Sequence, residues 1–221
     1  GRIMKAVLAI VLAAGIVGCG GPNLSVSVRA GSPAATAVAR GALTAGSGIV
    51  LTRVRIVIRK VELEKAGTAE MDEIASGPYL LDLSGAALDS GAVGHLLDAS
   101  FTPGTYSEVK LELHKPDSGE TAVNADLQEM VAAQASIIAD GTIDGTPFSF
   151  KTAVNTDQRF EGNVELADGS NLTVNVDPSG WFASGGARLD PRNESNRSQI
   201  ENNIQSSFRA FRDDDHDGHE D

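Results

Sequence analysis

The chain has 221 residues and a formal net charge of −12, with 30 acidic side chains against 18 basic ones. This balance argues against nucleic-acid binding, which needs clustered Lys and Arg to neutralise phosphates, and against electrostatic adsorption to anionic lipids. A single cysteine allows no internal disulfide, so the stability of the fold must come from its core. Aromatic residues make up only 5% of the chain while Val, Ile, Leu and Thr are plentiful, which favours strands over a helical bundle.

The first segment with a clear meaning is MKAVLAIVLAAGIVGC, residues 4–19. Lys5 precedes an apolar run that is shorter than the roughly 20 residues of a transmembrane helix, a layout typical of a secretory signal peptide. The end of the run, Ile-Val-Gly-Cys, resembles the bacterial lipobox, in which the cysteine is lipidated and becomes the new N-terminus. We therefore predict a signal peptide over residues 1–18, lipidation of Cys19 and attachment to the membrane through acyl chains.

The next segment, residues 19–48, is rich in Gly, Ala, Ser and Pro. This composition predicts a lipidated N-terminus followed by a flexible tether, and weak alternation at Leu24, Val26 and Val28 is consistent with one short strand in it. The resemblance to lipoproteins also implies in which membrane the protein is anchored. Gly20 stands in place of an aspartate after the cysteine, which indicates the outer rather than the inner membrane.

A long strand is predicted from Ile49 onward, because apolar residues recur with a period of two through Leu63. The phase of this pattern slips at Thr52-Arg53 and at Arg59-Lys60, which predicts bulges or bends. We expect Ile56 and Ile58 on the buried face of this strand.

A second clear strand follows Pro103-Gly104, with Val109, Leu111 and Leu113 on its apolar face. Further along, Asp-Gly occurs twice between alternating segments, which is a strong hairpin signal because a type I′ turn needs positive φ at both central positions. Short strands separated by such turns predict an antiparallel β-sandwich of the prealbumin or immunoglobulin type over residues 49–182. The two predicted hairpins pair 137–143 with 146–152 around Asp144-Gly145, and 163–167 with 170–176 around Asp168-Gly169.

The last segment, residues 183–221, changes to a helical pattern and then to an acidic tail. Ser198 with Glu201 fits a capping box at a helix start. One amphipathic C-terminal helix is predicted from the apolar stripe Ile200, Ile204, Phe208 and Phe211, whose spacings of four, four and three lie on one helical face.

Three segments carry a family resemblance: 51–63 (LTRVRIVIRKVEL), 77–83 (GPYLLDL) and 103–111 (PGTYSEVKL). Together they look like a group of bacterial lipoproteins that share a β-sandwich domain of unknown function. The resemblance covers roughly residues 49–182 and implies a cell-surface sandwich. It supplies no catalytic residues.

The sharpest chemical signal is the acidic tail, which matches the D-x-[DN]-x-[DN]-G pattern of a calcium loop. Ca²⁺ prefers several oxygen ligands, and the glycine permits the sharp bend that brings them together. The pattern resembles the calcium loops of EF-hands, dockerins and thrombospondin type 3 repeats. Because the bidentate Glu at position twelve is missing, weak binding in the range of about 10⁻⁴–10⁻³ M is expected. The predicted ligands are Asp213, Asp215, Asp217, the backbone carbonyl of His219, and Asp221 at the ninth position.

Two other interpretations of the tail stay open. It can be a disordered acidic segment that keeps the protein soluble. It can also bind a transition metal through His216 and His219, since imidazole suits such metals, although carboxylates dominate this segment.

Two further features are candidates for ligand binding. Arg53, Arg55 and Arg59 place positive charge on the expected outer face of one strand, where they could hold an anionic glycan or the acidic surface of a protein partner, or form a solvated face. Trp181 could stack on a sugar ring, or lie buried beneath the C-terminal helix.

These features predict a non-catalytic binding or structural module of the cell envelope, with a carbohydrate or a protein as its partner. The alternative is an envelope polysaccharide hydrolase, which requires a deep cleft with two facing carboxylates. His95 and His114 are isolated from any Ser or Cys nucleophile motif, which favours the non-catalytic interpretation.

Overall fold

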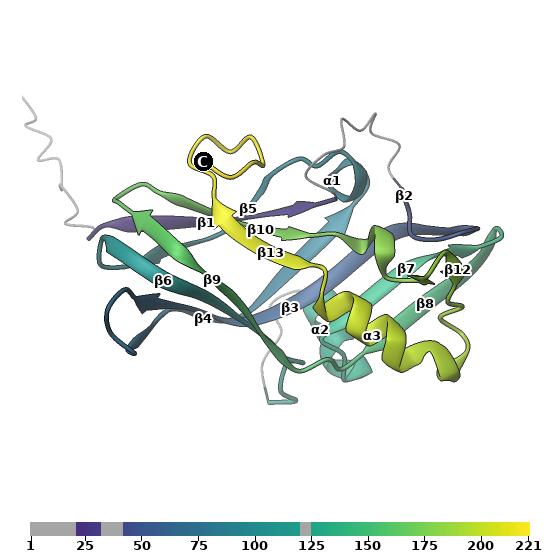
Figure 1. Ribbon diagram of the computed structural model, residues 1–221. Coiled ribbons are helices and arrows are strands. Elements are labelled where there is room, and N and C mark those ends of the chain that lie inside the picture. The colour runs from purple at the N-terminus through teal and green to yellow at the C-terminus, as the bar shows by residue number, and fades with distance from the viewer. Residues whose placement is uncertain (1–20, 32–41, 120–124) are drawn as a thin grey trace, which may run out of the picture.

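The computed structural model describes residues 21–31, 42–119 and 125–221. The expected signal peptide and Cys19 lie outside these described residues. Within them the protein is mainly β, as the composition and the alternation predicted, and its strands form open sheets accompanied by short helices (Figure 1).

The larger sheet has seven strands and is built around one long strand, β3 (Ile49–Lys65). β4 pairs antiparallel with one edge of β3, while β7 and β6 pair antiparallel with successive parts of its other edge. β8 pairs with the outer edge of β7, β9 with that of β6, and the two-residue strand β2 with the start of β3. The bounds are β2 Leu43–Thr44, β4 Met71–Ser84, β6 Gly104–Leu113, β7 Ile137–Ile143, β8 Thr146–Thr152 and β9 Thr156–Leu166.

The smaller sheet has four strands in the order β13-β10-β1-β5. β1 and β10 run parallel, so the expectation of a wholly antiparallel arrangement is wrong for this pair. A parallel pair needs a long connection, and here all seven strands of the larger sheet lie between β1 and β10 in sequence. The bounds are β1 Asn23–Ala30, β5 Gly94–Ser100, β10 Asn171–Val176 and β13 Phe208–Arg212; β11 (Ala183–Ser184) and β12 (Ala187–Arg188) form a separate ribbon.

The helices are short and lie in the connections between strands. They are α1 (Ala86–Asp89), α2 (Ala125–Ala133) and α3 (Arg197–Gln205), together with the 3₁₀ helices η1 (Pro178–Gly180) and η2 (Glu194–Asn196). None of the helices among the described residues is long and apolar enough to cross a membrane.

The strand suggested by Leu24, Val26 and Val28 exists as β1, and it occupies an interior position of the smaller sheet between β10 and β5. Its apolar side chains are buried in the core. This part of the segment predicted as a flexible tether therefore belongs to the folded unit.

The predictions for β3 and β6 are confirmed. Ile56, Ile58, Leu111 and Leu113 are all fully buried, and register shifts occur between Leu51 and Arg53 and between Ile58 and Lys60, where the alternation changes phase. One hydrophobic core takes residues from both sheets, so the apolar faces of the two sheets pack against each other.

The first predicted hairpin is also confirmed. β7 and β8 pair antiparallel from Ile137↔Thr152 to Ile143↔Thr146. The turn has φ of +48° at Asp144 and +82° at Gly145, as a type I′ turn requires.

The second predicted hairpin is wrong, because β9 and β10 belong to different sheets. The Asp168-Gly169 turn instead carries the chain from the larger sheet to the smaller one. The Asp168 side chain and the Gly169 backbone bind the start of β1. The Asn23 N–H donates to Asp168 Oδ1 at 2.8 Å, and the Gly169 N–H donates to the Asn23 carbonyl at 2.9 Å.

The predicted helical stripe is right at Ile200 and Ile204, which are buried on α3, and wrong beyond them. Phe208 begins strand β13, which pairs with β10, because the open edge of β10 satisfies the backbone groups of this segment. The capping box is wrong as well. The N-cap is Asn196, and the Glu201 carboxylate accepts a hydrogen bond from the Thr152 hydroxyl at 2.6 Å.

Truncation of the shared core tests this architecture. Leu111→Ala should lower the free energy of unfolding by about 2–5 kcal/mol, because it removes buried methyl groups and leaves a cavity. Asn163→Ala, at an exposed position of β9, should change it by less than about 0.5 kcal/mol. Chemical denaturation of both variants measures the difference, and equal losses would contradict the assignment of Leu111 to the core.

Candidate functional site

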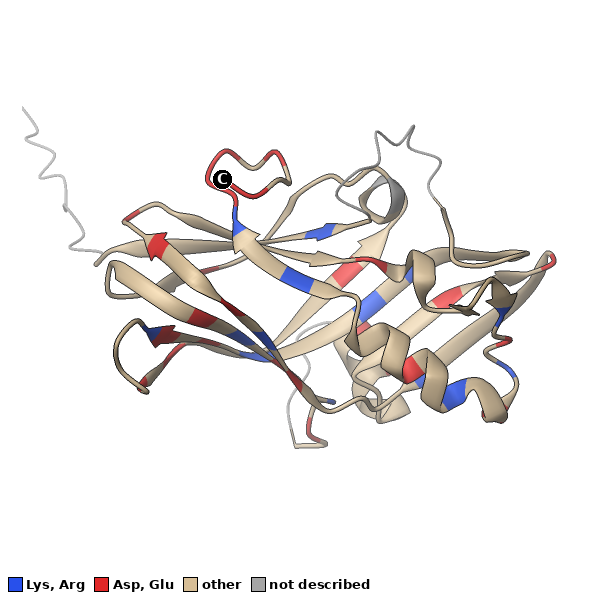
Figure 2. Ribbon diagram, in the orientation of Figure 1, with Lys and Arg blue, Asp and Glu red and all other residues tan. Residues whose placement is uncertain are grey.

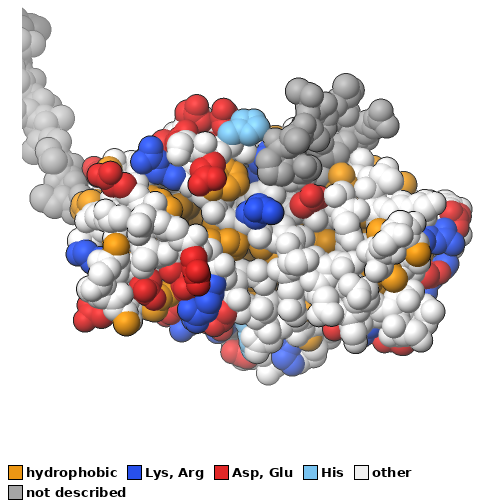
Figure 3. Space-filling view, in the orientation of Figure 1, with side chains coloured by type: hydrophobic (Ala, Val, Ile, Leu, Met, Phe, Trp, Pro, Cys, Tyr) orange, Lys and Arg blue, Asp and Glu red, His pale blue; other side chains and the backbone are white. Residues whose placement is uncertain are grey.

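The candidate site is the loop of residues 213–221, which follows β13 and which we call the C-terminal acidic loop. Figure 1 shows this loop, yellow and marked C, folding back over the smaller sheet. Acidic residues are concentrated in it (Figure 2), and the space-filling view shows acidic side chains gathered at the surface beside a histidine (Figure 3).

Asp213 anchors the loop to the sheet. Its side chain is fully buried, and its Oδ2 accepts hydrogen bonds from the Thr173 hydroxyl at 2.7 Å and from the Gly218 N–H at 3.2 Å. The Asp213 N–H donates to the Asn171 carbonyl at 3.0 Å, which extends the pairing of β13 with β10 by one residue. A buried carboxylate is costly unless it is hydrogen-bonded, and these donors meet that requirement.

Asp213, Asp215 and Asp217 are brought together, as their spacing predicted. One carboxylate oxygen of each lies within 4.8 Å of those of the other two. Two ligands at 2.3–2.6 Å from a common calcium ion can be at most about 4.6–5.2 Å apart, so the cluster fits Ca²⁺ in size as well as in ligand chemistry.

The backbone between these aspartates is tightly turned. Asp215 Oδ1 accepts from the Asp217 N–H at 3.2 Å, and Asp217 Oδ1 accepts from the His219 N–H at 2.8 Å. His216 and Gly218 have positive φ, +58° and +83°. A Cβ at Gly218 would also lie only 2.8 Å from the Arg29 Nε, so this position favours glycine on two grounds.

Asp221 is placed differently from the prediction. Among the described residues, its carboxylate does not join the group of three. The role of the His219 backbone carbonyl as a ligand stays a prediction. The Asp221 Oδ2 accepts from the Asp214 N–H at 2.6 Å, and the Asp221 N–H donates to the Arg212 carbonyl at 3.1 Å. Asp221 therefore closes the loop onto its own start.

Sequence reasoning missed a layer of buried polar side chains beneath the loop. Asn171 Nδ2 donates to the Asp213 carbonyl at 2.9 Å and to the Thr173 hydroxyl at 3.1 Å, and Asn171 Oδ1 accepts from the Ser27 hydroxyl at 2.8 Å. The signal was present in the sequence: polar residues occupy every second position in both β1 and β10. Alternating polar positions in β1 and β10 predict a face of the sheet that is exposed to solvent. In the structure, the C-terminal acidic loop covers part of this face.

Arg29, on β1, is the second residue that the sequence analysis missed. It is 4% exposed, and it donates to the Gly218 carbonyl at 2.8 Å and to the Gly91 carbonyl at 2.9 Å. Its positive charge lies against a loop with a large excess of carboxylates, and this placement offsets part of their mutual repulsion.

Arg53 and Arg55 do not form the solvated cationic face that their sequence suggested. Arg55 is 3% exposed, with its guanidinium 2.6 Å from Glu129 and 2.8 Å from Asp140. Arg53 pairs with Asp82 at 2.6 Å and with Asp126 at 2.9 Å. These contacts hold α2 against β3, so both guanidinium groups are engaged by the protein's own carboxylates.

The remaining two candidates are also engaged within the fold. The Arg59 guanidinium lies 3.7 Å from the exposed carboxylate of Asp117. Trp181 is fully buried, and its Nε1 donates to the Ser207 hydroxyl at 2.9 Å. The indole ring has no exposed face for stacking on a sugar, so the buried alternative is the correct one.

The comparisons with known proteins give little similarity. No family model matches the chain, and no curated protein matches it. Among solved structures, MbnP from Methylosinus trichosporium matches with a TM-score of 0.42 and 11% sequence identity, over 76% of this chain and 82% of that one. No family assignment follows from these comparisons.

The arginine cluster leads to a prediction on acid stability. The Arg53 guanidinium lowers the pKa of Asp126 below the ordinary 3.8, and the Arg55 guanidinium lowers the pKa of Glu129 below the ordinary 4.5. Because the folded-state pKa values are depressed, the stabilisation is present above the unfolded pKa and is lost as the pH falls. Arg55→Met should therefore lose less stability than the wild type between about pH 7 and about pH 3.

Denaturant unfolding across this pH range measures the effect. Lys65→Met is a matched control, since Lys65 is an exposed cation on the same strand. If Arg55→Met and Lys65→Met follow the same pH dependence, the arginine cluster does not contribute to acid sensitivity.

Proposed function

We propose that this protein is a lipid-anchored module of the bacterial cell envelope with a binding or structural function rather than a catalytic one, and that a weak calcium site in the C-terminal acidic loop stabilises it. The observation that carries the proposal is the docking of the Asp213, Asp215 and Asp217 cluster on the smaller sheet. Such a site stabilises a surface instead of performing chemistry on a substrate.

The geometry supports calcium over other cations. The clustered ligands are carboxylate oxygens, which hard cations prefer, while no imidazole belongs to the cluster among the described residues. Three like charges within 4.8 Å repel one another, and a divalent cation between them removes that repulsion. The expected affinity is in the weak extracellular range of about 10⁻⁴–10⁻³ M.

We further propose that the two sheets form a β-sandwich of the prealbumin or immunoglobulin type, with α3 as its C-terminal amphipathic helix. The shared core between the sheets and the burial of Ile200 and Ile204 support this interpretation. A sandwich on a lipid anchor presents its surface to the envelope, where a glycan or a protein is the partner. The lipobox-like residues before Cys19 support export and anchoring, with the outer membrane as the destination.

Calorimetric titration with CaCl₂ tests the proposal. The wild type should bind with a dissociation constant of about 10⁻⁴–10⁻³ M, and unfolding should become less favourable by about 1.4 kcal/mol at a calcium concentration tenfold above that constant. Asp215→Ala should abolish or strongly weaken binding, because it removes a clustered ligand oxygen and its charge from an exposed position and leaves the core intact.

Glu220→Gln is the matched control. It removes the same charge from the same loop but from a residue outside the cluster. It should bind calcium nearly as the wild type does. The proposal fails if no heat appears up to ~10 mM calcium, or if the two variants weaken binding equally.

The lipid anchor has its own test. In cells grown with a labelled fatty acid, the protein should incorporate the label and partition into the detergent phase, whereas Cys19→Ala should do neither, because stable anchoring requires acyl chains on that residue. Unchanged detergent partitioning of the Cys19→Ala variant would contradict anchoring at this position.

A further inference from the structure

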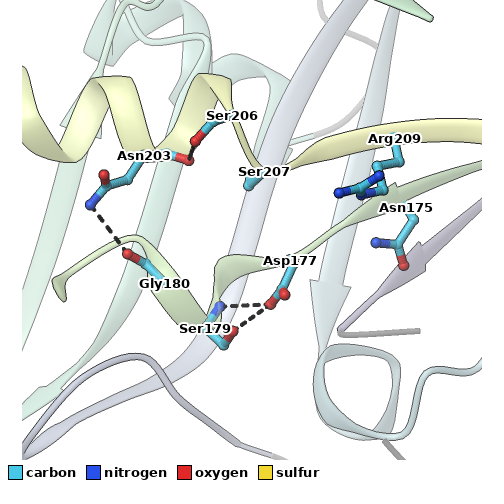
Figure 4. Close-up of a pocket in the computed structure, with 8 residues that line it drawn as sticks. All are labelled: Asn175, Asp177, Ser179, Gly180, Asn203, Ser206, Ser207 and Arg209. Carbon is cyan, nitrogen blue, oxygen red and sulfur yellow. Dashed lines mark hydrogen bonds between the residues drawn. The ribbon is translucent and has the colours of Figure 1, made fainter. Parts of the chain in front are cut away.

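A second polar feature lies on the smaller sheet, away from the cluster of Asp213, Asp215 and Asp217. A cavity of about 270 Å³ opens where β10, η1, the end of α3 and the start of β13 meet (Figure 4). Its size is near the lower end of ligand pockets, which run from roughly 300 to 1,000 Å³. A ligand that fills it is therefore small.

Each serine hydroxyl that lines the cavity donates its proton in a hydrogen bond within the protein. Ser179 donates to Asp177 Oδ1 at 2.6 Å, Ser206 donates to the Asn203 carbonyl at 3.0 Å, and Ser207 donates to the Ile204 carbonyl at 2.6 Å. A serine hydroxyl carries one proton and two acceptor lone pairs. Toward a ligand these groups act as acceptors.

Two stronger acceptors line the same cavity. Asn175 is 1% exposed, and its Oδ1 has no hydrogen-bond partner among the described residues. A buried amide oxygen without a partner is rare and costly in folded proteins. The Asp177 carboxylate uses its Oδ1 for the N–H and hydroxyl of Ser179, and its Oδ2 accepts no hydrogen bond from the described residues.

The cavity has one basic side chain among the described residues that line it, Arg209. Arg209 is the cross-strand partner of Asn175, so the two side chains lie beside each other on β13 and β10, as Figure 4 shows. Arg209 is exposed, and its guanidinium forms no salt bridge or hydrogen bond with any described residue. The guanidinium fork is therefore available to bind a carboxylate.

We propose that this cavity binds a small zwitterion, a free α-amino acid. The ligand carboxylate pairs with the Arg209 guanidinium, and the ligand ammonium donates to Asp177 Oδ2 and Asn175 Oδ1. An ammonium group has three donors and no acceptor, which suits a cavity rich in acceptors. A simple anion is disfavoured by the Asp177 carboxylate, and a neutral sugar by the lack of an aromatic ring among the described lining residues.

Calorimetric titration of the full chain with L-alanine tests the proposal. Arg209→Gln and Asp177→Asn should each weaken binding at least about tenfold, because each removes one charge-assisted contact. Asp177→Asn keeps a side-chain oxygen for the Ser179 N–H, so the turn at η1 is retained. Arg159→Gln, an exposed arginine on β9, is the matched control and should bind like the wild type.

Two half-ligands separate the contacts. Acetate binding should weaken in Arg209→Gln only, and methylammonium binding in Asp177→Asn only. Absence of L-alanine binding up to ~10 mM, or equal binding by both cavity variants and the wild type, would overturn the proposal. Binding of phosphate or D-glucuronate without binding of L-alanine would also overturn it.

Discussion

β3 forms backbone hydrogen bonds along both of its edges, and this double pairing constrains the rest of the larger sheet. One edge pairs with the two-residue strand β2 and then with β4, while the other passes from β7 to β6 near Ile58. A register shift lies at the same place, between Ile58 and Lys60. Because a bulge bends a strand and increases its twist, it lets the β7–β8 and β6–β9 pairs take different directions while both still contribute to one core.

The smaller sheet has a polar outer face, and this face must be supplied with hydrogen-bond partners where it is buried. β1 and β10 carry buried polar side chains there. Over Thr173 those partners come from the C-terminal acidic loop, whose Asp213 accepts from the hydroxyl. Two residues further along β10, Asn175 faces the cavity. The proposed calcium loop and the proposed ligand cavity therefore share one strand pair, β10–β13, and both depend on its register.

Local patterns in the sequence were sufficient for features that depend on neighbouring residues alone. Period-two alternation identified the buried face of β3 and β6, and its phase slips located the bulges. Asp144-Gly145 identified a hairpin, since its flanking segments pair with each other. The spacing of Asp213, Asp215 and Asp217 identified a carboxylate cluster, because a tight turn within one short loop is enough to bring them together.

Features that depend on distant partners were decided by the tertiary structure. Asp168-Gly169 has the same turn signal as the first hairpin, yet its flanking strands pair into different sheets. Phe208 continues a helical spacing, but the segment that begins at Phe208 forms strand β13, because it pairs with the open edge of β10. Arg55 occupies a position that alternation assigns to the outside, and the carboxylates of α2 and β7 bury it. In each case, a long-range hydrogen bond or ion pair outweighs a local preference worth less than about 1 kcal/mol per residue.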